Sequence, residues 1–248
     1  MFLNEMYNIS IKASNFFGYV DSGERKLRHS FDDDQSFASH LRRNFKTAHI
    51  IEYYFNSGRR SLFQAKYKEA SSTLSEAFTG CYKDSVSNKR QILRYLIPVK
   101  MRVGRRPSVG LLRKYKMEQF IGIADAVGNG NVQQLESELL RGQADFVRWG
   151  LFMVLKKLRI IALRNLFRKV YLIIHKAHGA AGKSTVIEVN AFKVALDFQG
   201  QDTSLDEVEC IVANLVSNGY IKGYISHKLA KVVFSKANAF PPLSQCGL

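Results

Sequence analysis

The stretch Leu205–Ser235, LDEVECIVANLVSNGYIKGYISHKLAKVVFS, joins a helical pattern to a two-stranded pattern. Ser204 and Glu207 have the spacing of a capping box, which satisfies free amides in the first turn of a helix. Asn218-Gly219 can end that helix, because glycine enters the left-handed region at little cost. Apolar residues recur at three- and four-residue steps and line one side of the helix: Leu205, Val208, Ile211, Val212, Leu215 and Val216.

Two extended segments follow this helix. Tyr220–Ile225 and Lys231–Ser235 are rich in β-branched and aromatic residues, and a short polar turn at Ser226-His227 separates them. A helix followed by a hairpin is the second half of a winged helix. Its first half is expected at Val186–Val189, as a strand, and at Ala191–Phe198, as a helix. The predicted core of the winged helix combines apolar residues of the second helix and the hairpin: Val208, Ile211, Val212, Leu215, Tyr220, Ile225 and Val233.

The sequence before the winged helix predicts paired helices. One helix is expected over Thr47–Phe63 and a second, after a turn, over Tyr67–Phe78. Small residues such as Ala70 and Ala77 let two helices approach closely, as in tetratricopeptide-like pairs. No second copy follows at a period of about 34 residues, so we expect a stack of helical hairpins and no regular repeat array.

Further helices are expected at Ser87–Gly104, Pro107–Lys114 and Met117–Val127. Pro98 lies inside the first of these and should kink it or mark a junction between two helices. Asn131 and Gln134 can cap the helix that follows.

Two later segments complete the stack. Phe146–Leu158 is nearly apolar all round and is expected to be central. Apolar residues between Ile160 and Ile174 step by three and four, which predicts an amphipathic helix. Its outer face is expected to carry Arg164, Arg168 and Lys169.

We therefore predict a mostly α-helical protein in which stacked antiparallel, tetratricopeptide-like hairpins precede a C-terminal winged helix. Residues 1–46 form a partial N-terminal helical segment and loop, and residues 47–176 form the stack. The winged helix occupies residues 177–236 and opens with a basic glycine-rich loop at 177–185. Residues 237–248 are a tail whose prolines cannot continue a helix or the interior of a sheet.

The composition limits the classes of function. A net charge of +16 and a pI near 9.8 favour an acidic partner such as RNA, DNA, a phospholipid surface or an acidic protein. The three cysteines, Cys81, Cys210 and Cys246, lie far apart in the sequence, so we expect neither a disulfide framework nor a zinc site. We therefore expect the protein to work in a reducing compartment. No apolar run approaches about 18 residues, and no secretory signal is evident, so we expect a soluble intracellular protein without membrane insertion.

No set of residues predicts catalysis. Ala177–Ser184, AHGAAGKS, fits a loosened phosphate-loop pattern, but the segment before it has helical periodicity, so a nucleotide hydrolase using Lys183 is a disfavoured alternative. His175 and His178 have no evident further metal ligands, and Asp32–Asp34 lack the glycine and glutamate of a calcium loop. Nucleophile–base sets and apolar carboxylate pairs are also missing, so we expect no enzyme activity, cofactor or metal.

Basic residues are concentrated in two stretches, 85–116 and 146–187, which contain no Asp or Glu. A solvent-exposed protein surface normally carries positive and negative side chains side by side, so two long stretches with basic residues alone are unusual. The helix at Leu205 instead begins with Asp206 and Glu207, which would repel phosphates, so it is not expected to read DNA bases. The basic helices and the wing are predicted to bind phosphates of nucleic acid through Lys222, His227, Lys228, Lys231, Arg105, Arg106, Lys114, Lys156, Lys157 and Arg159.

Docking on an acidic protein is the alternative use of these basic stretches, and the two uses are compatible.

Four phrases carry a resemblance to a known family. They are ILRYLIPVKMRVG at 92–104, LRNLFRKVYL at 163–172, LDEVECIVANLVSNGYIKGYISH at 205–227 and KVVFSKANAFPPLS at 231–244. With the predicted helical stack and winged helix, these phrases closely resemble the PCI domain family, and within it the Thp-type PCI subunits of the nuclear-pore-associated transcription-and-export complex. The similarity runs from about Asn44 to the C-terminus.

The resemblance implies a non-enzymatic scaffold or adaptor subunit of an mRNA-export complex in the nucleus, at nuclear pores, with a further cytoplasmic pool. Members of this family pair with a larger PCI scaffold protein of the Sac/GANP type and with a small acidic protein of the Dss/Sem type. Their paired winged helices bind RNA or DNA on a basic platform. The alternative is a PCI subunit of a proteasome-lid or signalosome-like assembly that does not bind nucleic acid.

Two features depart from the family's pattern. Family members carry a longer helical N-terminal half, so Met1 is expected to fall within their repeat stack. The resemblance therefore implies nothing about contacts that the additional helices make. The loop at His178–Asn190 is also expected to be longer than that of the family.

Overall fold

The computed structural model describes residues 46–177 and 185–246. Tyr53–Leu248 form one compact unit, to which all the contacts below belong. The acidic turn Asp32–Asp34 and most of the glycine-rich loop, including His178 and Lys183, lie outside the described residues.

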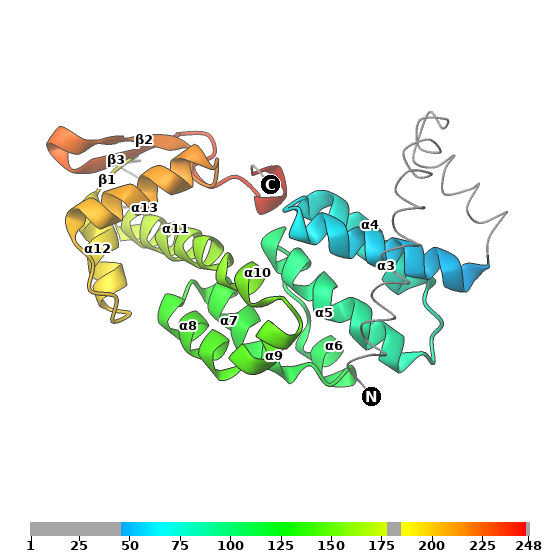
Figure 1. Ribbon diagram of the computed structural model, residues 1–248. Helices are drawn as coiled ribbons and strands as arrows, with labels where there is room; N and C mark the ends of the chain where they lie inside the picture. The colour runs from blue at the N-terminus through cyan, green and yellow to red at the C-terminus, as the bar shows by residue number, and fades with distance from the viewer. Residues whose placement is uncertain (1–45, 178–184, 247–248) are drawn as a thin grey trace, which may run out of the picture. The chain divides into compact units, whose positions relative to one another are not determined.

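The stack begins with three long helices, α3 (Thr47–Phe63), α4 (Tyr67–Gly80) and α5 (Val86–Arg102) (Figure 1). Ala70 and Ala77 of α4 are fully buried, in agreement with the close helix pairing predicted from these small residues. The close approach also depends on Gly58 of α3, where a Cβ would lie 2.6 Å from Cγ of Leu74. The first predicted helical hairpin is therefore confirmed.

The helix α5 continues through Pro98, so the helix-to-helix junction expected there is wrong. A proline inside a helix removes one N–H donor, which costs several kcal/mol where nothing compensates. Pro98 is buried between Ile97 and Val99, which are themselves almost fully buried. Apolar packing on both sides of the proline holds the helix in one piece.

Shorter helices follow α5: α6 (Val109–Lys114), η1 (Glu118–Phe120), α7 (Ile121–Asn129), α8 (Val132–Arg141), α9 (Gln143–Arg148) and α10 (Phe152–Lys156). The helix α11 (Arg159–Ala177), of 19 residues, then precedes the winged helix. The cap predicted at Asn131 is present, since its Oδ1 accepts a hydrogen bond from the backbone N–H of Gln134 at 2.9 Å.

The segment 146–158, which was expected to be central, is buried on one side and exposed on the other. It divides into α9 and α10 near Gly150, which has a φ of +70°. Phe146 and Leu155 are fully buried, whereas Met153 is exposed. The apolar pattern therefore predicted the burial but not the break, which a glycine in the left-handed region permits.

The winged helix consists of β1 (Val186–Glu188), α12 (Val189–Asp197), α13 (Leu205–Ser217), β2 (Gly223–Ser226) and β3 (Lys231–Phe234). The sheet is antiparallel with the strand order β1-β3-β2. The predicted capping box is present at the start of α13, where the side chains of Ser204 and Glu207 each accept a backbone N–H of the other residue. Gly219 has a φ of +72° after that helix.

The core of the winged helix differs from the prediction at Val233. Val208, Val212, Leu215 and Tyr220 are buried, and Ile211 and Ile225 are partly buried against the same core. Val233 lies on the opposite face of the sheet, paired with Val186 and Tyr224. Successive residues of a strand point to opposite faces, so the buried positions of β3 are Val232 and Phe234.

The C-terminal tail returns to the helical stack after β3. The backbone N–H of Lys222 donates to the carbonyl of Ala239 at 2.9 Å, which ties the tail to the start of the wing. A short turn, η3 (Leu243–Gln245), then reaches the end of α5. The approach is tight at Gly104, which has a φ of +87° and where a Cβ would lie 2.8 Å from Cβ of Leu243.

Arg164 of α11 holds this tail and is not on the outer face predicted for it. Only 7% of Arg164 is exposed, whereas Arg168 and Lys169 are exposed as expected. The guanidinium donates to the carbonyl oxygens of Pro241 at 2.7 Å and Phe240 at 3.3 Å. The prediction failed because the tail covers that part of α11.

The fold class is confirmed, since the chain is mostly helical with one small sheet in a C-terminal winged helix. The division into residues 47–176 and 177–236 stays a prediction, because the compact unit includes both parts.

Candidate nucleic-acid interface

The basic residues of the wing lie along one hairpin. Lys222 directly precedes β2, whereas His227 and Lys228 lie in η2 (His227–Leu229) at its other end, and Lys231 begins β3. Lys222, His227 and Lys228 are exposed, and Lys231 is partly exposed. Figure 1 shows the tip of this hairpin directed away from the C-terminal tail. The four side chains therefore mark the length of the wing.

His227 is coupled to the acidic helix. Its Nδ1 lies 2.6 Å from Oε2 of Glu209 on α13. The hydrogen bond to Glu209, followed by the charge of the same carboxylate, raises the pKa of His227. A nearby carboxylate offsets the positive charge of the imidazolium, so His227 is a weaker candidate for a phosphate contact than Lys228.

Two predicted contacts in the stack also face carboxylates. Nη2 of Arg106 lies 2.8 Å from Oδ1 of Asp125, and Nε of Arg159 lies 3.2 Å from Oε1 of Glu136. Arg159 also donates to the side-chain oxygen of Gln201 at 3.3 Å. These guanidinium groups join neighbouring elements of the protein, which limits their availability for phosphates.

Lys114 lies apart from the basic residues of the wing. Its ammonium is 5.7 Å from the ring centre of Tyr115, at the end of α6. The side chain is exposed, and Figure 1 shows α6 distant from the wing.

Arg105, Lys156 and Lys157 gather near the ends of α5 and α10. All three are exposed, and none has an ion pair with a carboxylate among the residues that the structure describes. Nη1 of Arg102 donates to the carbonyl of Lys157 at 3.4 Å, so the two helix ends are adjacent.

Arg102 joins this group to the start of the wing, a role that sequence analysis missed. Its guanidinium carbon lies 5.2 Å from the ring centre of Tyr67 and 5.7 Å from that of Tyr220. Tyr220 is two residues before Lys222, so the wing begins beside the end of α5. Cation–π contacts between residues this far apart in sequence leave no periodic signal.

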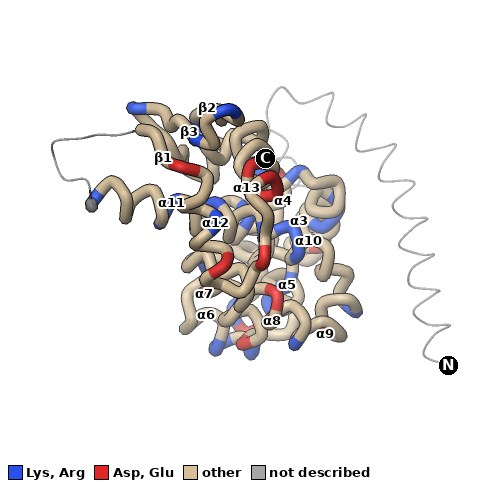
Figure 2. The backbone as a smooth tube through the Cα atoms, turned by 90° about the vertical axis from the view of Figure 1, so that its left-hand side faces the viewer, with Lys and Arg blue, Asp and Glu red and all other residues tan. Residues whose placement is uncertain are grey.

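The ten predicted residues therefore do not form one continuous patch. Lys222, Lys228 and Lys231 follow the hairpin, and Arg105, Lys156 and Lys157 lie near its beginning. Figure 2 shows basic residues on the β2–β3 hairpin and acidic residues on the nearby helix α13. A polyanion would be attracted by the hairpin and repelled by the exposed start of α13.

The other candidate sites of the sequence lie at the end of α11 and in the loop that follows it. Helix α11, and no strand, precedes the glycine-rich loop, contrary to the strand–loop–helix order of a phosphate loop. His175 packs edge-on against Tyr171 with ring centres 4.3 Å apart. Within residues 46–177 and 185–246, no group of three or more His, Cys, Asp or Glu could hold a metal. No described helix is long and apolar enough to cross a membrane.

Comparisons with known proteins agree with this architecture. Residues 129–236 match the PCI domain. Over 208 residues, 84% of this chain and 50% of the relative, the sequence is 43% identical to PCI domain-containing protein 2 of Xenopus laevis. Identity to PCI domain-containing protein 2 of Danio rerio is 41% over the same shares. Identity to PCI domain-containing protein 2 homolog of Caenorhabditis elegans is 42%, over 82% of this chain and 48% of the relative.

The chain spans about half the length of the curated relatives it matches. The match to the PCI domain includes α8, α9, α10, α11 and the entire winged helix. The phrases that suggested the family fall in α5, α11, α13 and the segment from β3 into the tail. The chain therefore belongs to the PCI domain family and is homologous to the proteins named PCI domain-containing protein 2.

Proposed function

We propose that the chain acts as a non-enzymatic scaffold subunit of an mRNA-export complex and binds RNA or DNA through its wing. In this proposal it pairs with a larger PCI protein of the Sac/GANP type and with a small acidic protein of the Dss/Sem type. It works in the nucleus at nuclear pores, with a further cytoplasmic pool. The PCI domain is a module of complex subunits, which supports the scaffold role.

The observation that carries nucleic-acid binding is the charge of the wing. Lys222 and Lys228 are exposed, and neither is paired with a carboxylate in the described parts of the chain. Exposed ammonium groups retain most of their hydration and charge, so they attract phosphates without a specific geometry. Binding of this kind is tolerant of base sequence and weakens steeply as salt increases.

The acidic start of α13 also supports contact through the hairpin and not through this helix. Asp206 and Glu207 are exposed in the first turn, where negative charge also stabilises the helix dipole. A winged helix that read bases in the major groove with this helix would bring these carboxylates close to phosphates. The proposed contact therefore uses the hairpin and leaves α13 facing a protein or solvent.

The alternative is a subunit of a proteasome-lid or signalosome-like assembly without nucleic-acid binding. The carboxylates next to Arg106, Arg159 and His227 favour this alternative, because these cations then form ion pairs within the protein and are less available to phosphates.

Identification of the partners separates the two functions. The tagged chain would be purified from nuclear extract under mild salt, and its partners would be identified by mass spectrometry. We expect a larger PCI protein of the Sac/GANP type and a small acidic protein of the Dss/Sem type. Recovery of proteasome-lid or signalosome subunits in their place would reject the export assignment.

A further inference from the structure

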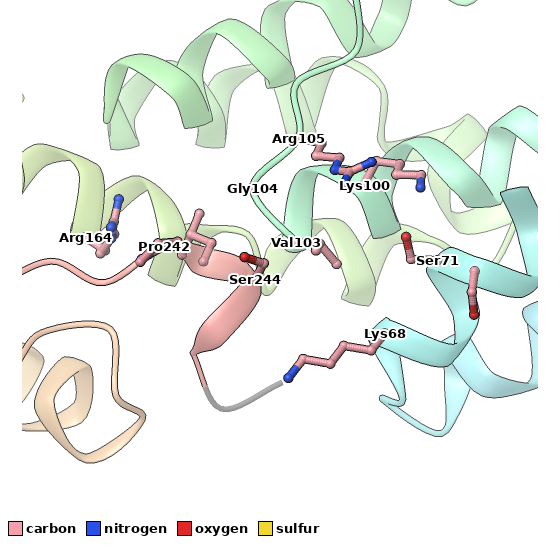
Figure 3. A pocket seen from close by; sticks show the side chains of 11 residues that line it. Lys68, Ser71, Lys100, Val103, Gly104, Arg105, Arg164, Pro242 and Ser244 are labelled. Atoms are coloured by element: carbon pink, nitrogen blue, oxygen red, sulfur yellow. The ribbon is translucent and has the colours of Figure 1, made fainter.

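A basic recess lies where the C-terminal tail meets the helical stack. Its volume is about 560 Å³, and it is bordered by the beginning of α4, the end of α5, α11 and the tail. Figure 3 shows Lys100 and Arg105 on one side of the recess, Lys68 extending from α4 on another, and Pro242 and Ser244 of the tail on a third. A volume of this size is within the range of small-molecule sites.

The charges around this recess have one sign. Lys68, Lys100, Arg105 and Arg164 line it together with the hydroxyl groups of Ser71, Ser72 and Ser244. No Asp or Glu is among its described lining residues. Lys68, Lys100 and Arg105 also form no ion pair with any described carboxylate. The recess thus concentrates positive charge that the described part of the chain does not neutralise.

The burial of Arg164 is the second, independent observation. It is 93% buried, and its Nε has no hydrogen-bond partner, although its other nitrogens bind carbonyl oxygens of the tail and Oδ1 of Asn165. A buried cation without a counter-ion costs several kcal/mol, because carbonyl dipoles replace only part of its hydration. A bound anion would supply the missing charge.

The pKa of Lys100 also indicates that the recess lacks negative charge. Burial, and then the neighbouring charge of Arg105, lower the pKa of Lys100. Like charges are held together here by the fold, and an anion between them would reverse the shift.

We propose that this recess binds a small, soluble molecule that carries several phosphate groups. Phosphate oxygens accept hydrogen bonds from ammonium, guanidinium and hydroxyl groups at once, which is the donor set that surrounds the recess. A compact ligand with several negative charges can meet Lys68 of α4 and Lys100 of α5 together, and the buried charge of Arg164 on α11 attracts it as well. An acidic peptide carries one charge per carboxylate and needs a longer groove to do the same.

A nucleic-acid backbone fits the recess less well than it fits the wing. A strand follows cations spaced along an open surface. Lys68, Lys100 and Arg105 border one partly open space, and the tail lines one side of it. Apart from Arg105, which is also a predicted nucleic-acid contact, the recess shares no residue with the predicted nucleic-acid interface, and it does not depend on the proposed export function.

The test uses the full chain and inositol hexakisphosphate as the probe, with binding measured by calorimetry at physiological salt. The variant replaces Lys68→Ala and Lys100→Ala, because neither ammonium has a described hydrogen bond to the protein and alanine suits both helices. Lys83→Ala with Lys116→Ala is the matched control, since both lysines are exposed and lie outside the recess. Thermal melting monitors the folding of each protein.

We expect one molecule of the probe per chain, and an affinity that falls about tenfold for each lost charge-assisted contact in the recess variant. The control variant should bind as the unmodified chain does. Absence of saturable binding, or an equal loss in both variants, would overturn the proposal.

Two further binding measurements, with RNA and with lipid vesicles, distinguish a soluble phosphate ligand from nucleic acid and from a lipid headgroup. Single-stranded RNA should bind the recess variant and the control variant equally. Phosphatidylcholine vesicles with phosphatidylinositol bisphosphate should bind the unmodified chain no better than vesicles without it. A selective loss of RNA binding in the recess variant would assign the recess to nucleic acid, and selective vesicle binding would assign it to a lipid headgroup; either result overturns the soluble ligand.

Discussion

The wing and the recess both concentrate positive charge, but the protein surrounds that charge differently. On the wing, Lys222 and Lys228 are exposed to solvent. In the recess, Lys68 and Arg105 are exposed, but Lys100 is partly buried and Arg164 is almost fully buried against the tail. Exposed cations bind polyanions weakly at each contact and tolerate movement, whereas buried cations require a partner of fixed shape. The same residue types therefore support an extended ligand at one site and a compact ligand at the other.

The recess also depends on the fold in a way that the wing does not. Its walls come from the consecutive helices α4 and α5 and, much later in the sequence, from α11 and the tail. Changes that release the tail should disturb the recess strongly and the wing less.

Loss of the Arg164 side chain should have the largest effect. Arg164→Met keeps the length and apolar stem of the side chain, but it leaves the carbonyls of Phe240 and Pro241 without this donor. We expect the free energy of unfolding to fall by about 2 to 3 kcal/mol in urea denaturation, because buried acceptors lose charged donors.

Arg168→Met is its control, because Arg168 is exposed on the same helix. This change should alter the free energy of unfolding by no more than about 0.5 kcal/mol. Equal effects of the two substitutions would show that Arg164 does not hold the tail.

Substitution of Gly104 should have the next largest effect. Gly104→Ala places a Cβ 2.8 Å from Cβ of Leu243 at a φ of +87°, so both the tail and the backbone must adjust. We expect a loss of about 1 to 2 kcal/mol in the free energy of unfolding.

Gly110→Ala in α6 is the matched change, since nothing lies within 4 Å of its added Cβ. This substitution should be neutral or stabilising by up to about 1 kcal/mol, because alanine favours the helix. A Gly104 variant as stable as the Gly110 variant would contradict the tight approach of the tail.

The smallest effect is expected at the tip of the wing. Glu209→Gln removes the carboxylate that raises the pKa of His227, so the pKa of His227 should fall toward its ordinary value in an NMR titration. In the unmodified chain, this pair stabilises the fold below the unfolded pKa of histidine. The stabilisation is lost as the pH rises through the higher folded pKa.

A pKa of His227 that is unchanged by Glu209→Gln would contradict the pairing of these two side chains.

The sequence predicted best what depends on neighbouring residues. The capping box at Ser204 and Glu207, the cap at Asn131 and the apolar side of α13 all follow from short spacings, and all are present. The prediction at β3 failed by one residue, because a short strand with the consecutive apolar residues Val232 and Val233 has no alternation to reveal its buried face.

Features that depend on distant contacts could not be predicted. The spacing of Arg164 along α11 places it with Arg168 on a polar face, and only the returning tail buries it. Arg102 likewise acquires its role from Tyr67 and Tyr220, which lie in different elements. The basic stretches therefore predicted an anionic partner, but not which cations are exposed, paired or buried.

The most direct test of nucleic-acid binding by the wing is the salt dependence of binding to a short DNA duplex. The variant combines Lys222→Gln, Lys228→Gln and Lys231→Gln, since glutamine avoids a second carboxylate opposite Glu188. The control combines Lys66→Gln, Lys83→Gln and Lys116→Gln, three exposed lysines of the stack. We expect the slope of log affinity against log salt to become shallower by about 0.9 for each lost phosphate contact in the wing variant only. Identical slopes for the wing variant, the control and the unmodified chain would contradict the account.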